Sequence, residues 1–306
     1  MLTLLVGGTA FAQTGPITVE DERGRTLTFD TSPQRFAACS SFALETLMAL
    51  GVEPVVRIHT PPVFPPEAES IPVVARSHST GPDVEMLIAT APDAILLHNV
   101  FGEFADTVQS SVGVPVVLHQ VKSLADIDRY VGMLGRLAGK TDRANELLGE
   151  LHATIDWMRN QPQPARAPKA LALLGTSDTW YAYRRNAFMG DLLEVLGVEN
   201  VAAEAEAHAK HRTLAPLDLE RIVEQDPDVL FVIPYGGVDP DTIENFMAHP
   251  AFASLRAVRD GRVYVLTDRI YSSHAGLRSG EALRTLYGLI YPDRPSPPGT
   301  FAANSP

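Results

Sequence analysis

The sequence predicts an α/β protein with two lobes of similar build joined by a long helix. Residues 83–97 and 218–232 share an Asp-x-Glu start, apolar residues at helical spacing, a Pro-Asp pair and an apolar run of strand type. A second shared pattern, Leu-Gly-Val-Glu, lies upstream at residues 50–53 and 196–199. Because both patterns recur in the same order, we expect each half of the chain to fold as one α/β unit.

Each longer repeated segment reads as a short helix followed by a buried strand. Asp83 and Asp218 are residues of a type that caps helix starts. Pro92 and Pro227 cannot continue a helix, and the apolar run after each is typical of a buried strand. The glycine of each Leu-Gly-Val-Glu pattern suits the left-handed backbone that follows a helix end.

Residues 141–160 are predicted to form the linking helix. Apolar residues recur at three- and four-residue steps over residues 127–158, Thr141 suits the helix start, and the proline-rich residues 161–164 end it. A helix of about 20 residues is about 30 Å long, which makes a stiff connection. The predicted parts are an N-terminal lobe over residues 17–138, this helix over 141–160, a C-terminal lobe over 168–292 and a loose tail over 293–306.

The first residues, 1–12, read as an export signal. They are apolar, too short to span a bilayer, and end in the small-x-small pattern Ala10-Phe11-Ala12, although the usual basic start is missing. A buried first strand is the alternative. Gln13 stands where a lipoprotein requires cysteine, and no later segment is long and apolar enough to span a membrane. We expect a soluble, periplasmic, monomeric protein.

Composition and missing motifs argue against several function classes. The formal net charge of −12 disfavours nucleic acid or an anionic membrane as the main partner, and the single cysteine, Cys39, permits no internal disulfide. The sequence contains no Gly-x-Ser-x-Gly, His-Glu-x-x-His or Cys-x-x-Cys motif. Residues 135–141 fail the phosphate-loop pattern because Leu134 stands where its first glycine is required. We therefore expect that the protein is not an enzyme.

Residues 17–25, 33–36, 43–52, 190–193 and 261–264 and both Asp-x-Glu repeats occur in a distinctive order and spacing. In these residues the chain resembles, over residues 17–291, the helical-backbone class (class III) of ABC-importer solute-binding proteins. Members of that class bind ferric siderophores, haem, cobalamin and some bare metals or oxyanions. The resemblance implies two Rossmann-like α/β lobes joined by one long backbone helix, with the ligand cleft between the lobes. It also implies a membrane permease as partner and an iron complex, a ferric siderophore or haem, as cargo, with no intrinsic cofactor.

The same resemblance assigns a docking role to one glutamate in each lobe, Glu85 and Glu220. Each follows a predicted helix cap by two residues, on the first turn and facing solvent. In this class such glutamates dock into arginine pockets of the permease. The alternative is a glutamate that only complements the helix dipole, which contributes about 0.3–1 kcal/mol.

Histidine, tyrosine and arginine residues follow the predicted strands, where α/β lobes bind ligands. Neutral imidazole is the commonest metal ligand, and phenolate suits ferric iron or haem. His119 also follows a strand and could join this set. The predicted metal ligands are His59, His78, His98 and His274. The predicted ligand-binding residues are His59, Arg76, His78, His98, Tyr181, Tyr183, Arg184, His211, Arg212, Tyr235, Tyr271 and His274.

The nature of the ligand stays open at this point. Haem or a bare divalent metal ion would use the histidines or a tyrosine directly, whereas anionic ferric chelates require positive charge. Cobalamin is less favoured because Trp180 is the only tryptophan placed to stack on it. A metal-dependent periplasmic enzyme or a metal chaperone would use the same histidine-lined surface. Arginines that could bind an anionic chelate are Arg76, Arg184, Arg212, Arg269 and Arg278.

Overall fold

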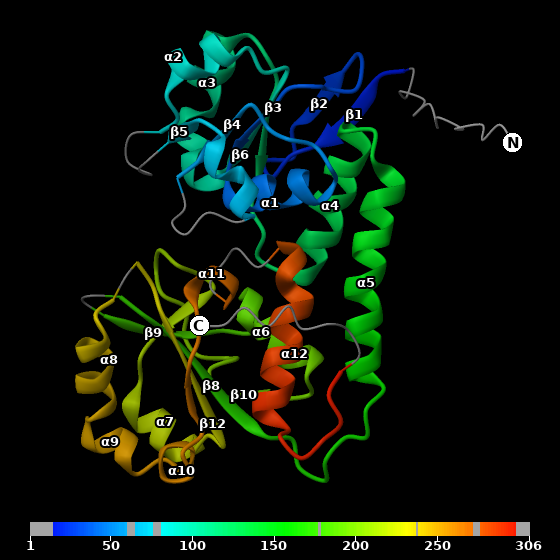
Figure 1. Cartoon of the computed structure of the whole chain (residues 1–306). Helices are drawn as coiled ribbons and strands as arrows, with labels where there is room; N and C mark the ends of the chain where they lie inside the picture. The colour runs from blue at the N-terminus through cyan, green and yellow to red at the C-terminus, as the bar shows by residue number, and fades with distance from the viewer. Residues whose placement is uncertain are drawn as a thin grey trace, which may run out of the picture. The chain divides into compact units, whose positions relative to one another are not determined.

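The computed structural model describes residues 15–59, 65–75, 81–176, 179–236, 238–271 and 276–297 (Figure 1). The chain divides into two compact units: unit 1 comprises Met1–Gln120 and Arg129–Asn145, and unit 2 comprises Val121–Asp128 and Glu146–Pro306. The predicted fold class of two α/β lobes is confirmed. The predicted export signal lies outside the described residues. Among the described residues no helix is long and apolar enough to cross a membrane.

Unit 1 is built on a parallel sheet with strand order β5-β4-β3-β6-β7. Strands β3, β4 and β7 are buried along their length and β6 is buried up to its last residue, as expected for a parallel sheet covered on both faces. Its strands are β3 (Phe36–Cys39), β4 (Val56–Ile58), β5 (Val73–Ala75), β6 (Ala94–His98) and β7 (Val116–His119), and β1 (Ile17–Glu20) pairs antiparallel with β2 (Thr26–Phe29). Its helices are α1 (Ser41–Ala49), η1 (Pro66–Ser70), α2 (Val84–Thr90), η2 (Asn99–Phe104) and α3 (Ala105–Val112).

Unit 2 is built on a mixed sheet with the order β11-β9-β8-β12-β13, and β10 pairs with the start of β8. Strands β8 (Lys169–Gly175), β12 (Val229–Pro234) and β13 (Val263–Val265) are parallel. Strands β9 (Trp180–Tyr183) and β11 (Leu214–Pro216) run antiparallel, and β10 is Glu199–Asn200. The helices are α6 (Phe188–Val195), α7 (Leu219–Gln225), α8 (Pro240–Met247), α9 (Pro250–Ala253), α10 (Arg256–Arg259), α11 (Asp268–Tyr271), η3 (Gly276–Arg278) and α12 (Ser279–Ile290).

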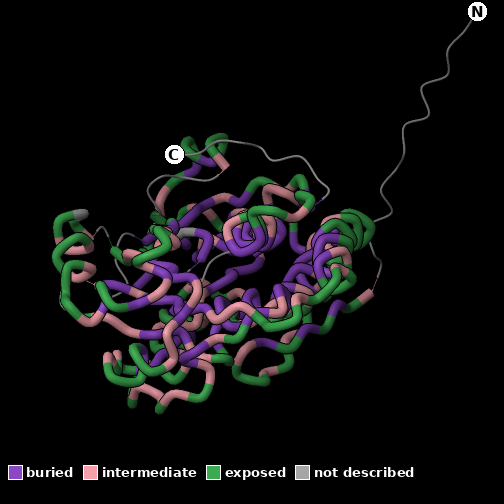
Figure 2. The backbone as a smooth tube through the Cα atoms, turned by 90° about the horizontal axis from the view of Figure 1, so that it is seen from below, coloured by how far each residue is buried: buried purple, intermediate pink, exposed green. Residues whose placement is uncertain are grey.

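Two long helices, α4 (Leu124–Leu137) and α5 (Thr141–Arg159), contain two of the three boundaries between the units, and the third lies just before α4. The predicted linking helix is present as α5, which has 19 residues. A side chain at Gly135 would overlap the Cβ of Ala144, so this glycine allows α4 and α5 to pack closely. The helical tubes in Figure 2 alternate between buried and exposed colours, as expected for amphipathic helices.

The internal repeat is visible in the backbone itself. Gly51 and Gly197, after α1 and α6, have φ of 76° and 68°, as the sequence predicts. Ala91 and Asp226, which end α2 and α7, are the only non-glycine residues with positive φ among those described. Each stands directly before the proline of a Pro-Asp pair. The repeated segments therefore end their helices with the same left-handed turn.

The aspartate of each Pro-Asp pair ties two neighbouring strands together. Asp93 accepts hydrogen bonds from the backbone N–H groups of Gln34 (2.8 Å) and Arg35 (2.9 Å), directly before β3. Asp228 accepts one from the backbone N–H of Lys169 (2.8 Å) at the start of β8. The repeat thus fixes the starts of β6 against β3 and of β12 against β8.

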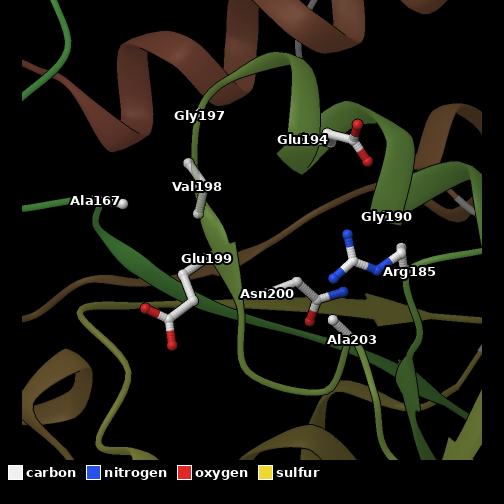
Figure 3. A pocket seen from close by; sticks show the side chains of 9 residues that line it. All are labelled: Ala167, Arg185, Gly190, Glu194, Gly197, Val198, Glu199, Asn200 and Ala203. Carbon is white, nitrogen blue, oxygen red and sulfur yellow. The ribbon is translucent and has the colours of Figure 1, made fainter.

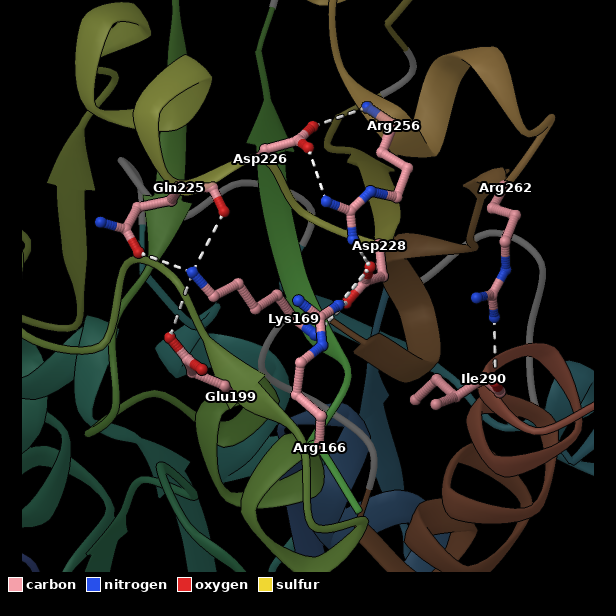
Figure 4. A network of polar contacts seen from close by, with 9 residues as sticks. All are labelled: Arg166, Lys169, Glu199, Gln225, Asp226, Asp228, Arg256, Arg262 and Ile290. Atoms are coloured by element: carbon pink, nitrogen blue, oxygen red, sulfur yellow. Dashed lines mark hydrogen bonds and ion pairs between the residues drawn. The ribbon is translucent and has the colours of Figure 1, made fainter. Parts of the chain in front are cut away.

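In unit 2 the same aspartate is the centre of an ion-pair network (Figure 4). Arg166 and Arg256 approach the Asp228 carboxylate to 2.5 and 2.6 Å, and Arg256 also pairs with Asp226 at 2.9 Å. Lys169 donates to the backbone carbonyl of Gln225 (3.2 Å) at the end of α7. These contacts join the end of α7 to the starts of β8 and β12.

The ion-pair network around Asp228 leads us to expect that the free energy of unfolding falls in acid. Burial raises the pKa of Asp228, but hydrogen bonds from Lys169 and Arg256 and the charge of Arg166 outweigh it, so the pKa lies below its ordinary 3.8. A depressed folded-state pKa means that the stabilisation is complete above the ordinary pKa and is lost as the pH falls toward the folded-state value. We expect Asp228→Asn to lower the free energy of unfolding by about 1–3 kcal/mol at pH 7.

Urea unfolding curves measured at several pH values check this prediction. The difference between wild type and Asp228→Asn should shrink as the pH falls below about 4. Asp260→Asn, at an exposed aspartate of the same unit, is the control. A difference that is independent of pH would show that the Asp228 charge does not stabilise the fold.

Candidate functional site

Three adjacent strands of unit 1 bring polar side chains together at their carboxyl ends. His98 and His119 are the last residues of β6 and β7 and lie opposite each other in the register. Their ring centroids are 6.0 Å apart and the rings are nearly perpendicular, at 89°. Ser40 follows the last residue of β3. This edge is where parallel α/β sheets bind ligands.

His119 is the buried member of this group, with 2% of its surface exposed. Its Nε2 lies 2.7 Å from Ser40 Oγ, which also accepts the backbone N–H of Ala43 (2.9 Å) and so caps α1. The rings of Phe42 and Tyr130 each lie 5.7 Å from the His119 ring. His119 is therefore held inside unit 1, and its ring packs edge-on against the ring of His98.

His98 is partly exposed, and its Nδ1 accepts a hydrogen bond from the backbone N–H of Val100 (3.1 Å). This bond to the first turn of η2 fixes the orientation of the imidazole. His59 follows β4 and is exposed. Arg76 and His78 lie outside the described residues.

Unit 2 carries a group of one phenol and two imidazoles, Tyr181, His208 and His211, which we call the imidazole–phenol cluster. The two histidine rings are stacked with centroids 5.2 Å apart and planes at 13°. The Tyr181 ring meets them edge-on at 5.2 and 6.4 Å. Tyr181 pairs with Leu174, next to the carboxyl end of β8, whereas both histidines lie beside the start of β11, which pairs with Tyr183. Tyr181 is thus the member of the cluster that lies next to the ligand-binding edge of this sheet.

Backbone contacts hold the cluster in place. The backbone N–H of His208 donates to the carbonyl of Leu214 (2.8 Å), and its Nδ1 accepts the backbone N–H groups of Lys210 (3.3 Å) and His211 (3.2 Å). Arg184 donates to the carbonyls of Ala205 (2.7 Å) and Arg212 (2.9 Å), on either side of the two histidines. Arg184, predicted to bind ligand, thus fastens the loop that carries the cluster.

A family model described as a periplasmic binding protein matches residues 37–270 of the chain. The chain belongs to this family. A cobalamin-binding protein of Halobacterium salinarum is 27% identical over 235 residues, which are 75% of this chain and 60% of that protein. The chain thus spans about 60% of the length of that relative. The high-affinity heme uptake system protein IsdE of Staphylococcus aureus is 22% identical over 219 residues, covering 70% of this chain and 73% of IsdE.

Solved structures share the fold of this periplasmic binding protein. The structure of S. aureus IsdE complexed with heme has a TM-score of 0.72 at 20% identity, covering 84% of this chain and 98% of IsdE. The petrobactin-binding protein YclQ of Bacillus subtilis has a TM-score of 0.78 at 18% identity, covering 92% and 99% of the two chains. At such identities the likeness concerns the fold alone.

The remaining predicted ligand-binding residues differ in how far they are exposed to solvent and in whether they are paired. Tyr183 and Tyr271 are buried, at 4% and 3% exposure, and burial raises the pKa of Tyr271 to about 12. Tyr235 is exposed after β12, and Arg212 is exposed beside the cluster. Arg278 is paired with Glu281 at 2.8 Å, whereas His274 and the side chain of Arg269 lie outside the described residues.

Among the described residues of this periplasmic binding protein, no three His, Cys, Asp or Glu side chains are arranged to hold a metal ion. Two of the four predicted metal ligands, His78 and His274, lie outside those residues, so that histidine set stays a prediction. Cys39 is fully buried, and burial raises the pKa of its thiol to about 12, which makes it a core residue.

A pocket of about 300 Å³ lies elsewhere in unit 2 (Figure 3). It opens beside Ala167 and β10, at the amino end of β8, opposite the end next to which Tyr181 lies. Arg185, one of its charged lining residues, is paired with Glu204 at 2.8 Å. This pocket is therefore separate from the ligand-binding edge. It is lined by Ala167, Arg185, Gly190, Glu194, Gly197, Val198, Glu199, Asn200 and Ala203.

The two predicted docking glutamates occupy equivalent places in the two units. Glu85 and Glu220 are the second residues of α2 and α7, and both are exposed. Asp83 and Asp218 cap these helices through 3.0 Å hydrogen bonds from the third helical residue. Both glutamates are therefore presented to solvent by the same local structure.

Proposed function

We propose that this protein captures an iron complex, a ferric siderophore or haem, in the periplasm and delivers it to the membrane permease of an ABC importer. The observation that carries the proposal is the imidazole–phenol cluster, whose Tyr181 lies next to the ligand-binding edge of the unit 2 sheet. Membership in the periplasmic binding protein family supports the transport role. So do the names of relatives, which include a heme uptake protein and a petrobactin-binding protein.

The chemistry of the cluster suits iron better than it suits cobalamin. Imidazole nitrogen and phenolic oxygen are both known iron ligands, and the flat stacked rings of His208 and His211 offer a face to an aromatic chelate. Lys210 and Arg212 are exposed in the same loop and add positive charge for an anionic chelate. We expect the protein to act as a monomer, without an intrinsic cofactor, and to release its cargo chemically unchanged.

Titration of the purified protein tests this proposal. Haem, a ferric catecholate siderophore, cobalamin and Zn²⁺ are each added while absorption and tryptophan fluorescence are recorded, and the cargo is then recovered after denaturation. We expect one iron complex to bind with a Kd of about 1 μM or tighter and to return intact. Tight binding of cobalamin or Zn²⁺ alone would contradict the iron proposal. A chemically altered cargo would indicate an enzyme instead.

A further inference from the structure

Two exposed aliphatic side chains repeat at equivalent positions of the two units. Ile88 on α2 is 54% exposed and Val223 on α7 is 41% exposed. The described residues contain only three other large hydrophobic side chains that are comparably exposed: Val100, Tyr235 and Val265. Single exposed aliphatic residues are ordinary on protein surfaces. Their recurrence at the same place in both halves of an internal repeat calls for a shared cause.

Each of these side chains is a neighbour of a predicted docking glutamate. Ile88 follows Glu85 by three residues, and Val223 follows Glu220 by three, which places both members of each pair on the same helix face. The opposite faces are anchored by Leu87 and Ile222, which are buried. The exposed face of each helix thus presents one carboxylate next to one aliphatic group.

The surroundings of the two pairs indicate what kind of partner they fit. On α7, a shallow hollow of about 350 Å³ lies beside Glu220 and is lined by Asp218, Arg221, Glu224 and Gln225. Together with Glu220 these residues make five, of which Asp218, Glu220 and Glu224 are acidic. The hollow therefore suits a basic side chain of a partner. On α2 the residue equivalent to Glu224 is Ala89, so that patch is smaller and less charged.

We propose that Glu85–Ile88 and Glu220–Val223 are two docking patches, one on each unit, and that in each patch the aliphatic side chain packs on the permease beside a basic residue that pairs with the glutamate. This inference rests on the proposed function. An exposed ion pair alone contributes little in water, because solvent and salt screen it. An apolar contact next to the ion pair excludes water and strengthens it.

Binding to the permease of the source organism's ABC importer, reconstituted in lipid nanodiscs, tests the proposal. We compare the full chain with the double variant Ile88→Gln/Val223→Gln by surface plasmon resonance, and we check folding by circular dichroism and thermal midpoint. The double variant should bind about tenfold more weakly or worse with its fold unchanged. Val265→Gln, at an exposed valine outside the two helices, and the conservative pair Ile88→Val/Val223→Ile should stay within about twofold of wild type.

A parallel variant, Glu85→Gln/Glu220→Gln, separates this inference from the proposed function. If the glutamate variant binds weakly and the aliphatic variant binds like wild type, the aliphatic contact is wrong and the transport role stands. If wild type does not bind the permease at all, the docking role fails and the inference fails with it. If sedimentation shows a wild-type dimer that the aliphatic variant loses while permease binding is unchanged, the patches serve self-association and the inference is overturned.

Discussion

Replacing His208 and His211 together by alanine is expected to weaken binding of the iron complex about 100-fold, equivalent to about 2.7 kcal/mol. The two rings are stacked face to face, and Tyr181 meets them edge-on, so the double substitution removes most of the imidazole–phenol cluster. Both histidines are at least partly exposed, and their loop is held by Arg184 and backbone hydrogen bonds. The fold should therefore survive the change.

Fluorescence and absorption titrations with haem and with a ferric catecholate siderophore measure this effect. His152→Gln is the matched control, because His152 is an exposed histidine of unit 2 that pairs with Asp128 at 2.8 Å. The control should bind like wild type. If wild type binds a complex tightly and the His208→Ala/His211→Ala variant binds it with the same affinity, the cluster is not part of the binding site.

Neutralising both predicted docking glutamates is expected to slow delivery without affecting capture. The Glu85→Ala/Glu220→Ala variant should import the iron complex about 30-fold more slowly, since each lost charged contact at an interface costs about 1 kcal/mol or more. Each single variant should show an intermediate loss. Affinity for the iron complex in solution should be unchanged, because both glutamates lie at helix starts and neither belongs to the imidazole–phenol cluster.

Uptake of the radiolabelled iron complex into cells or proteoliposomes that contain the importer measures this effect. Glu244→Gln, at an exposed glutamate on α8, controls for the loss of negative charge and should transport normally. Wild-type delivery should also weaken as salt is raised, because salt screens exposed charges. Full uptake by the double variant would show that these glutamates do not dock on a permease.

The fold was largely predictable because the internal repeat encodes it in local signals. The capping aspartates, the left-handed Gly51 and Gly197 and a helix at Thr141–Arg159 are confirmed, whereas the role of that helix as the link between the lobes stays a prediction. The left-handed turns at Ala91 and Asp226 were not predicted, because non-glycine residues rarely adopt that backbone. The predicted cleft between the lobes stays a prediction.

The candidate site was predicted only in part, because the pattern of apolar residues locates the strands but does not determine the path of the loops between them. Tyr181 and His211 were predicted, and the structure brings them into ring contact. His208 was missed because it precedes β11 and reaches the cluster only when its loop folds back onto Leu214. His119 carried a usable signal, since it ends a strand beside His98. The side-chain period of two along β9 aligns Tyr183 with Tyr181, but Tyr183 lies deeper and is buried.

Native mass spectrometry of the protein isolated from the periplasm of its own source, with an absorption spectrum of the same sample, tests the central claim most directly. We predict one intact iron complex per chain, with either a Soret band or a broad visible charge-transfer band, and loss of that cargo in the His208→Ala/His211→Ala variant. A chain that carries cobalamin or a colourless divalent ion, or that holds a cleaved product, would contradict the claim that it captures iron complexes for import.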